Sequence, residues 1–174
     1  MKAKRVLQSI ALSLLFLISP VFAAHPPQVS EKMTGQSLPS FNTQTLDGKS
    51  FTDQSAKGPI LFNFFASWCP PCRRELTFLR ELNATYGGKI KFIGVLIDPV
   101  ESPETMKDAR SLLAQNPLPY PVLMMTPAIK ESFKFEGIPT VYLVDKSGKF
   151  STTLYGPQPA KVIEQHIQKV LSSK

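Results

Sequence analysis

Two cysteines separated by two residues constrain this chain more than any other feature. Cys69 and Cys72 are its only cysteines, and both lie in the segment SWCPPC at residues 67–72. An apolar run at 60–65 precedes them, and a helical pattern follows from about Arg73. A buried strand, a tight turn with two cysteines and a helix together predict a redox site.

The predicted position of Cys69, just before a helix, favours its reactivity. A helix N-terminus has unpaired N–H groups and a partial positive charge, so it stabilises a thiolate and lowers the pKa of a cysteine placed there. We therefore predict that Cys69 is the exposed nucleophile and that Cys72, in the first turn, is the resolving thiol. Pro71 suits the first helical position, where no N–H is needed.

Two other uses of the cysteines explain the pattern less well. A structural zinc site takes about four ligands, whereas His25 and His166 lie far from the pair at no ligand spacing. A purely structural disulfide at this spacing closes a small loop and constrains the unfolded chain little. The inert disulfide is kept as the alternative to redox chemistry.

The N-terminal residues have the pattern of an export signal. Residues 1–5 are basic and residues 6–19 are mostly apolar, while Val21 and Ala23 suit cleavage after Ala23. The alternative is an uncleaved membrane anchor at 6–24, near the lower length limit for crossing a bilayer. In either case we expect an exported, periplasmic domain. Disulfides persist in that compartment, so keeping the cysteines reduced requires a supply of electrons.

These boundaries leave one domain of ordinary composition. We expect a signal peptide at 1–23, a flexible mature N-terminus at 24–37 and a folded domain at 38–174. The chain is 43% hydrophobic with 12 phenylalanines, which is enough for a core without disulfide staples. The net charge is +7, but no basic run interleaved with aromatic residues indicates nucleic-acid binding.

The pattern of the domain predicts an α/β fold. A hairpin is expected at 38–52, turning at Asp47-Gly48. The apolar run at 59–66 predicts a strand buried on both faces, with Asn63 hydrogen-bonded inside the core. Phe78 widens the apolar stripe of the helix that follows. That helix is expected at 70–86. Further helices are expected at 102–115, at 126–135 and after 159. Further strands are expected at 89–97, 120–125, 141–144 and 149–155.

Two acids are candidates for the site because of their position on the sheet. A helix connects the strands at 59–66 and 89–97, so the two strands are expected to be parallel. Asp98 and Glu101 follow the second strand. Functional sites form at the carboxyl edge of parallel sheets.

Two motifs far apart in the sequence resemble the thioredoxin superfamily. They are WCPPC at 68–72 and Gly-Ile-Pro-Thr at 137–140. The N-terminal hairpin and the additional helix and strand between Ile97 and Thr126 make the chain similar to the exported TlpA/ResA/CcmG (DsbE) branch. The resemblance covers about residues 38–171. It implies a thioredoxin-like fold, in which helices flank a central mixed sheet, with an N-terminal β-hairpin and an extra helix-strand insertion.

The resemblance implies roles for several residues. Cys69 attacks the disulfide of a target protein and Cys72 resolves the mixed disulfide, with no cofactor beyond this redox-active pair. Pro139 is expected to be cis and to lie against the cysteines. The backbone of Ile138 is then free to pair with an extended substrate. The expected substrate-binding surface is completed by Trp68, Pro70 and Pro71.

The proton acceptor for Cys72 stays open in the sequence. Thioredoxins themselves have a buried acid at the position that matches Asn63, where this chain has an amide. ResA-like members use a glutamate beyond the next strand instead. Asp98 and Glu101 are the nearest acids there, and Glu101 is slightly favoured for its reach.

The sequence therefore predicts an exported thiol-disulfide oxidoreductase that reduces protein disulfides. The family suggests apocytochrome c, with its haem-attachment cysteines, as the substrate class, and a membrane thiol-relay protein of the DsbD/CcdA type as the electron donor. Two alternatives stay open. One is a periplasmic disulfide oxidant or isomerase, and the other is a non-catalytic protein that binds copper(I) through its thiolates. A peroxiredoxin-type peroxidase is disfavoured, because its cysteine should stand alone.

Overall fold

The apolar run that precedes the cysteines forms the central strand of the fold. This strand, β4 (Ile60–Phe65), is buried along its whole length. It pairs in parallel with β5 (Lys91–Leu96), as predicted, and antiparallel with β7 (Thr140–Val144). The computed structural model describes residues 28–173 of the chain.

The central sheet has six strands in the order β1-β8-β7-β4-β5-β6. Its edge strands are β1 (Gln28–Ser30) and β6 (Val122–Met124), and β8 (Phe150–Tyr155) lies between β1 and β7. β6 is parallel to β5, whereas β8 is antiparallel to β7. The predicted mixed sheet of an α/β fold is therefore confirmed.

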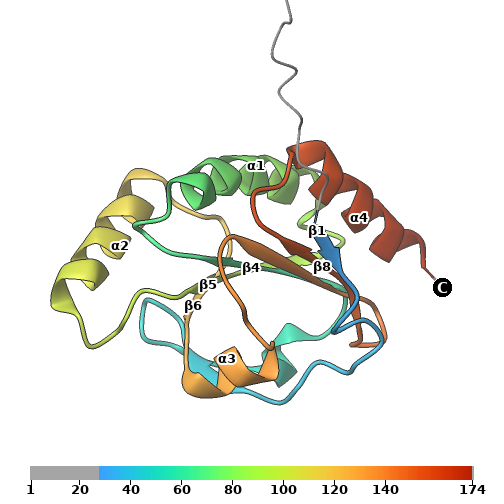
Figure 1. Cartoon of the computed structure of the whole chain (residues 1–174), viewed down its shortest axis with the longest axis horizontal. Coiled ribbons are helices and arrows are strands. Elements are labelled where there is room, and N and C mark those ends of the chain that lie inside the picture. Colours follow the sequence, from blue (N-terminus) through green and yellow to red (C-terminus); the bar gives the residue numbers. More distant parts are fainter. Residues whose placement is uncertain (1–27, 174) are drawn as a thin grey trace, which may run out of the picture.

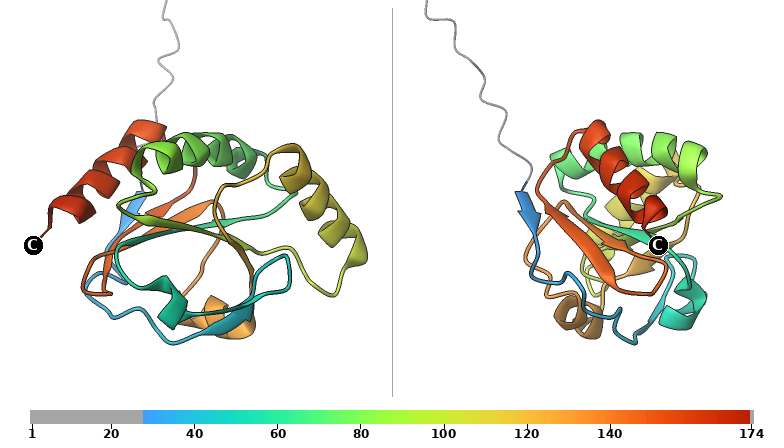
Figure 2. Two further views of the ribbon diagram at one scale, coloured as in Figure 1. Left: turned by 180° about the vertical axis from the view of Figure 1, so that it is seen from behind. Right: turned by 90° about the vertical axis from the view of Figure 1, so that its right-hand side faces the viewer.

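Helices cover both faces of this sheet (Figures 1 and 2). α1 (Pro70–Tyr86) and α4 (Ala160–Ser172) lie on one face, above the sheet in Figure 1. α3 (Pro127–Ser132) lies below it. The predicted helix-strand insertion is α2 (Pro103–Gln115) followed by β6. The predicted hairpin forms a separate two-stranded sheet of β2 (Asn42–Gln44) and β3 (Ser50–Thr52).

The strand β4 divides the core into two clusters, because its side chains alternate between the faces. Leu61 and Phe65 belong to the cluster beneath α1 and α4, which also contains both cysteines. Phe62 and Phe64 belong to the cluster on the opposite face, which is rich in aromatic rings. Only the first of these two clusters contains side chains expected to react.

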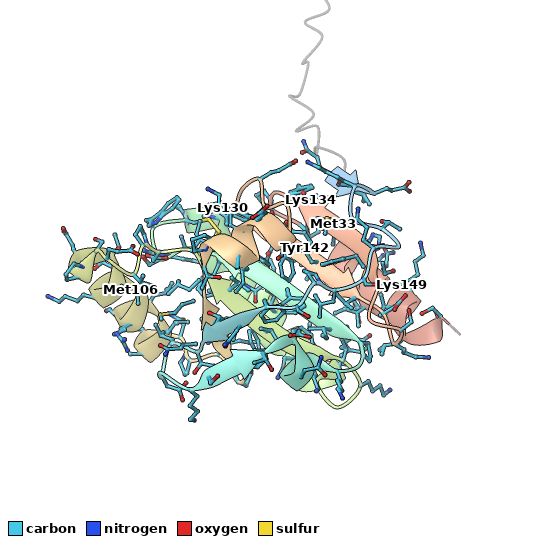
Figure 3. The ribbon with its side chains drawn as sticks, turned by 90° about the horizontal axis from the view of Figure 1, so that it is seen from below. Met33, Met106, Lys130, Lys134, Tyr142 and Lys149 are labelled. Atoms are coloured by element: carbon cyan, nitrogen blue, oxygen red, sulfur yellow. A yellow bond between two sulfur atoms is a disulfide. The ribbon has the colours of Figure 1, made fainter. Side chains whose placement is uncertain are left out.

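The N-terminal residues are more ordered than the sequence indicates. The segment 24–37 is predicted to be flexible, yet β1 pairs with β8 and Met33 is buried. Met33 and Tyr142, both labelled in Figure 3, belong to the same aromatic cluster. The predicted signal peptide falls outside the described residues, and within 28–173 no helix has the length and hydropathy needed to cross a bilayer.

Asn63 departs from its predicted role on the central strand. The side chain is buried, but its Oδ1 has no hydrogen-bond partner among residues 28–173. The prediction that Asn63 is hydrogen-bonded inside the core is therefore wrong for its amide oxygen. By strand alternation it shares the α1 face with Leu61 and Phe65, where its neighbour on β5 is Gly94, which has no side chain to bond it.

Candidate active site

Cys69 and Cys72 form a disulfide at the N-terminus of α1. Cys69 is the N-cap residue, and the helix begins at Pro70, as predicted, so that Pro71 holds the second helical position rather than the first. Neither proline has an amide hydrogen, so the first N–H of the helix belongs to Cys72. That N–H donates to Sγ of Cys69, 3.2 Å away. The helix N-terminus therefore interacts with the sulfur of Cys69, as the sequence predicts.

Both cysteines are buried in this oxidised state. Cys69 is 4% exposed and Cys72 is 1% exposed, because both pack into the core cluster beneath α1. The prediction that Cys69 is exposed is therefore wrong for the disulfide form. Trp68, directly before Cys69, is 57% exposed. A partner that exchanges disulfides must approach a small area of sulfur next to this indole ring.

The loop before the disulfide is held from two sides at Ser67. The backbone N–H of Ser67 donates to Oδ2 of Asp98 at 2.8 Å, and its hydroxyl donates to Oδ1 of the same carboxylate. From the other side, Nε of Arg73 donates to the carbonyl oxygen of Ser67 at 2.7 Å. These bonds fix the backbone two residues before Cys69. Arg73 is thus bound to the loop rather than simply solvated.

The two acids proposed from the sequence lie in different surroundings. Asp98 is buried, and both of its oxygens accept hydrogen bonds from Ser67. Glu101 is exposed in the turn after β5. Neither position is that of a buried acid with a free oxygen next to Cys72.

A third acid, which the sequence reasoning missed, fits that description better. Glu75 lies on α1, three residues after Cys72, and both side chains are on the buried face of the helix. Residues at this spacing are neighbours on a helix surface. Burial raises the pKa of Glu75 to about 7, and a weaker hydrogen bond from the backbone N–H of Gln158 opposes the shift. Glu75 can therefore gain or lose a proton near neutral pH.

Glu75 is buried but close to the surface. The backbone N–H of Gln158 donates to its Oε2 at 3.4 Å. Both residues border a groove of about 290 Å³ between α1 and the loop before α4. The groove also contains Phe78, which is exposed, so the prediction that Phe78 widens the buried stripe is wrong. The groove gives solvent a short path towards this carboxyl group.

The distant Gly-Ile-Pro-Thr motif has the predicted backbone geometry. The Ile138–Pro139 peptide bond is cis. Pro139 is buried, and its carbonyl oxygen accepts the N–H of Gly156 at 2.9 Å. Ile138 is half-buried and packs against the core cluster that contains both cysteines. Contact between substrate and these two residues, or between substrate and Trp68, Pro70 and Pro71, stays a prediction.

Comparisons with known proteins agree with this geometry. The Redoxin family model matches residues 33–171. The chain is 31% identical over 134 residues to the thioredoxin-like protein YneN of Bacillus subtilis (strain 168). The matched region covers 76% of this chain and 78% of YneN. The chain is also 29% identical over 180 residues to a thiol-disulfide oxidoreductase ResA of Bacillus cereus. That matched region covers 98% of this chain and 99% of ResA.

A solved structure has a similar fold. It is a thiol:disulfide interchange protein of the thioredoxin family from Chlorobium tepidum TLS, with a TM-score of 0.69 and 29% sequence identity. The match covers 78% of this chain and 96% of the other. The likeness therefore extends over more than three quarters of this chain and nearly all of the other.

Proposed function

Because this chain belongs to the Redoxin family, within the thioredoxin superfamily of thiol-disulfide oxidoreductases, we propose that it is an exported reductase of protein disulfides. The observation that carries the proposal is the disulfide at the N-terminus of α1, where the first free N–H of the helix bonds Sγ of Cys69. Such a bond stabilises the thiolate that attacks and leaves during exchange.

The reaction proceeds in two exchanges. In the reduced enzyme the Cys69 thiolate attacks one sulfur of the target disulfide, and the other target sulfur leaves as a thiolate. Cys72 then loses its proton and attacks Sγ of Cys69. The target leaves with its second sulfur as a thiol, and the Cys69–Cys72 disulfide forms again. Two electrons pass from the enzyme to the target.

Glu75 is the group that we propose as proton acceptor for Cys72, in place of Glu101 and Asp98. It is buried one helical turn after Cys72, and its pKa of about 7 suits transfer near neutral pH. Asp98 has both oxygens bonded to Ser67, and Glu101 is exposed. The groove beside Glu75 then lets the proton reach solvent.

The partners follow from the same proposal. An exported pair of cysteines becomes oxidised unless electrons are supplied, which a membrane thiol-relay protein of the DsbD/CcdA type would do. The proposed substrate is apocytochrome c with oxidised haem-attachment cysteines. An extended target segment would pair with the backbone of Ile138, as in strand addition.

The test uses a peptide with a disulfide-bonded c-type haem site. We expect the reduced wild-type protein to reduce it, Cys69→Ser to be inactive, and Cys72→Ser to stop at a mixed disulfide detectable by mass. Equal turnover by wild type and Cys69→Ser would contradict the proposal. Titration against glutathione separates a reductase from an oxidant, and metal analysis after anaerobic purification tests copper binding.

A further inference from the structure

The side chain of Gln158 is polar but buried, in the loop between β8 and α4. Its Nε2 donates to the carbonyl oxygens of Tyr155 and Gly156, at 2.7 and 3.2 Å. A flipped amide would place its oxygen against these two carbonyl oxygens, which accept and do not donate. The two bonds therefore fix the orientation of the amide, and its other end is the acceptor Oε1.

This Oε1 is buried and has no hydrogen-bond donor among residues 28–173. A buried acceptor without a donor costs free energy, so a group that supplies a donor there is favoured. Gln158 already contacts one group that can gain a proton, because its backbone N–H donates to Oε2 of Glu75 at 3.4 Å. Both residues border the groove of about 290 Å³ between α1 and the loop before α4.

The two polar groups of Gln158 suit the two protonation states of Glu75. The backbone N–H bonds to the ionised carboxylate and so lowers its pKa, against the larger effect of burial. The amide oxygen can only accept, so it suits the neutral carboxylic acid, whose O–H is a donor. Since the pKa of Glu75 is about 7, both states are populated near neutral pH.

Other titratable or charged groups near Glu75 do not bond to this oxygen. Cys72 lies one turn earlier on α1, and Arg74 borders the groove. Tyr120, before β6, interacts with Glu75 electrostatically, and burial raises the pKa of its hydroxyl far above neutral. The loop before α4 adds no charged residue to the groove wall. While the disulfide is intact, Glu75 is therefore the member of this group that changes charge near neutral pH.

We propose that Gln158 is a positioning residue, whose Oε1 accepts the O–H of Glu75 after that carboxyl group has taken the proton of Cys72. The proposal rests on the proposed function, because it completes the proton transfer assigned there to Glu75. The S–H bond of Cys72 breaks, an O–H bond forms on Glu75, and the new thiolate attacks Sγ of Cys69. Gln158 then holds the neutral carboxyl group until the proton passes to water in the groove.

The test measures the pKa of Glu75 in the oxidised protein, by carbon NMR of labelled glutamate carboxyl groups, with Glu75→Gln to assign the signal. Gln158→Met has a side chain of similar length and keeps the backbone N–H, but it has no oxygen to accept the bond. Because the neutral state loses its partner, we expect the pKa of Glu75 to fall by about one unit. An unchanged or raised pKa would overturn the proposal.

A second variant separates this contact from a general loosening of the loop. Gln158→Glu places a second carboxyl group beside Glu75, and two carboxyl groups that share a site raise the pKa of one of them. We expect a rise of about one unit or more, whereas a loosened loop would admit water and lower the pKa in both variants. Gln168→Met is the matched control on α4, where Nε2 donates to the hydroxyl of Tyr86, and it should leave the pKa of Glu75 unchanged.

The rate at which Cys72 resolves the mixed disulfide tests the proposed function separately. We expect its pH profile to bend at the pKa of Glu75, and to move with that pKa in Gln158→Met. A resolution rate that depends on Glu75, together with a pKa that Gln158→Met does not change, would overturn the role of Gln158 alone. A resolution rate that is the same in wild type and Glu75→Gln would overturn the proton transfer itself.

Discussion

The two faces of the central sheet are built from different kinds of side chain. On the α3 face, Phe133 lies at the centre of an aromatic cluster, with ring centroids 5.1 to 6.3 Å from its neighbours. Burial raises the pKa of Tyr142, a member of this cluster, far above its ordinary value, so it stays neutral. The α1 face instead contains the disulfide and the carboxyl group of Glu75.

This difference separates stability from chemistry. Aromatic rings contribute large buried areas and favourable edge contacts, and they carry no charge that changes near neutral pH. Buried polar groups without a hydrogen-bond partner among residues 28–173 occur on both faces, namely Oδ1 of Asn63 and the hydroxyl of Tyr120 on the α1 face and the hydroxyl of Tyr142 on the α3 face. The α1 face differs in its buried carboxyl group, because the pKa of Glu75, about 7, allows that group to titrate near neutral pH.

The largest expected effect tests the aromatic face. Phe133→Ala should lower the free energy of unfolding by about 3–5 kcal/mol, because it removes a fully buried ring and leaves a cavity. The protein that remains folded should keep its rate of disulfide exchange. Denaturant titration measures the first quantity and peptide reduction the second. Phe78→Ala is the control for stability and should have a much smaller effect, since Phe78 is exposed.

The next effect tests the α1 face through pH. The pKa of Glu75 rises from an ordinary 4.5 to about 7 on folding, so the folded state binds a proton more tightly than the unfolded state. Stability from this group is therefore complete below pH 4.5 and is lost as pH rises towards 7. The loss corresponds to about 3 kcal/mol, at 1.36 kcal/mol per pKa unit.

Replacing Glu75 with glutamine should remove that loss. We compare the free energy of unfolding of Glu75→Gln with that of wild type at two pH values. The difference, variant minus wild type, should be about 3 kcal/mol larger above pH 7 than below pH 4.5. Resolution of the mixed disulfide should slow about a hundredfold, since general-base contributions are of this order. Glu101→Gln, at an exposed acid, should change neither quantity. An unaltered pH dependence in Glu75→Gln would show that its carboxyl group is not the titrating group.

Local patterns in the sequence are sufficient to predict the strand and the helix on either side of the disulfide. The bounds of α1 agree with the predicted 70–86, because a proline pair begins the helix and Gly87 ends it. Glu75 escapes the sequence reasoning because it lies among the leucines of the same stripe, where an apolar residue is the usual occupant. Its burial could have been inferred from its three-residue spacing after Cys72.

Other features depend on contacts between distant segments. Cys69 is buried because its loop, the core beneath α1 and the bonds between Ser67 and Asp98 come together only in the fold. β1 has three residues, too few to show the alternation of a strand, and it is stabilised by pairing with β8. Neither contact leaves a periodic signal in the sequence.

The smallest expected effect concerns the junction of α1 with the disulfide. Pro71→Ala adds an amide hydrogen in the first turn, where such groups point towards the N-cap side chain, here Sγ of Cys69. A second donor favours the thiolate by about 0.3–1 kcal/mol, so the reduction potential should become about 6–20 mV more positive. Pro103→Ala, in the first turn of α2 behind the N-cap Ser102, is the control and should leave the potential unchanged. If titration against glutathione gave the same potential for both variants, the sulfur of Cys69 would not be sensitive to donors at the helix terminus. The chemistry of the α1 face would then be set by burial rather than by α1.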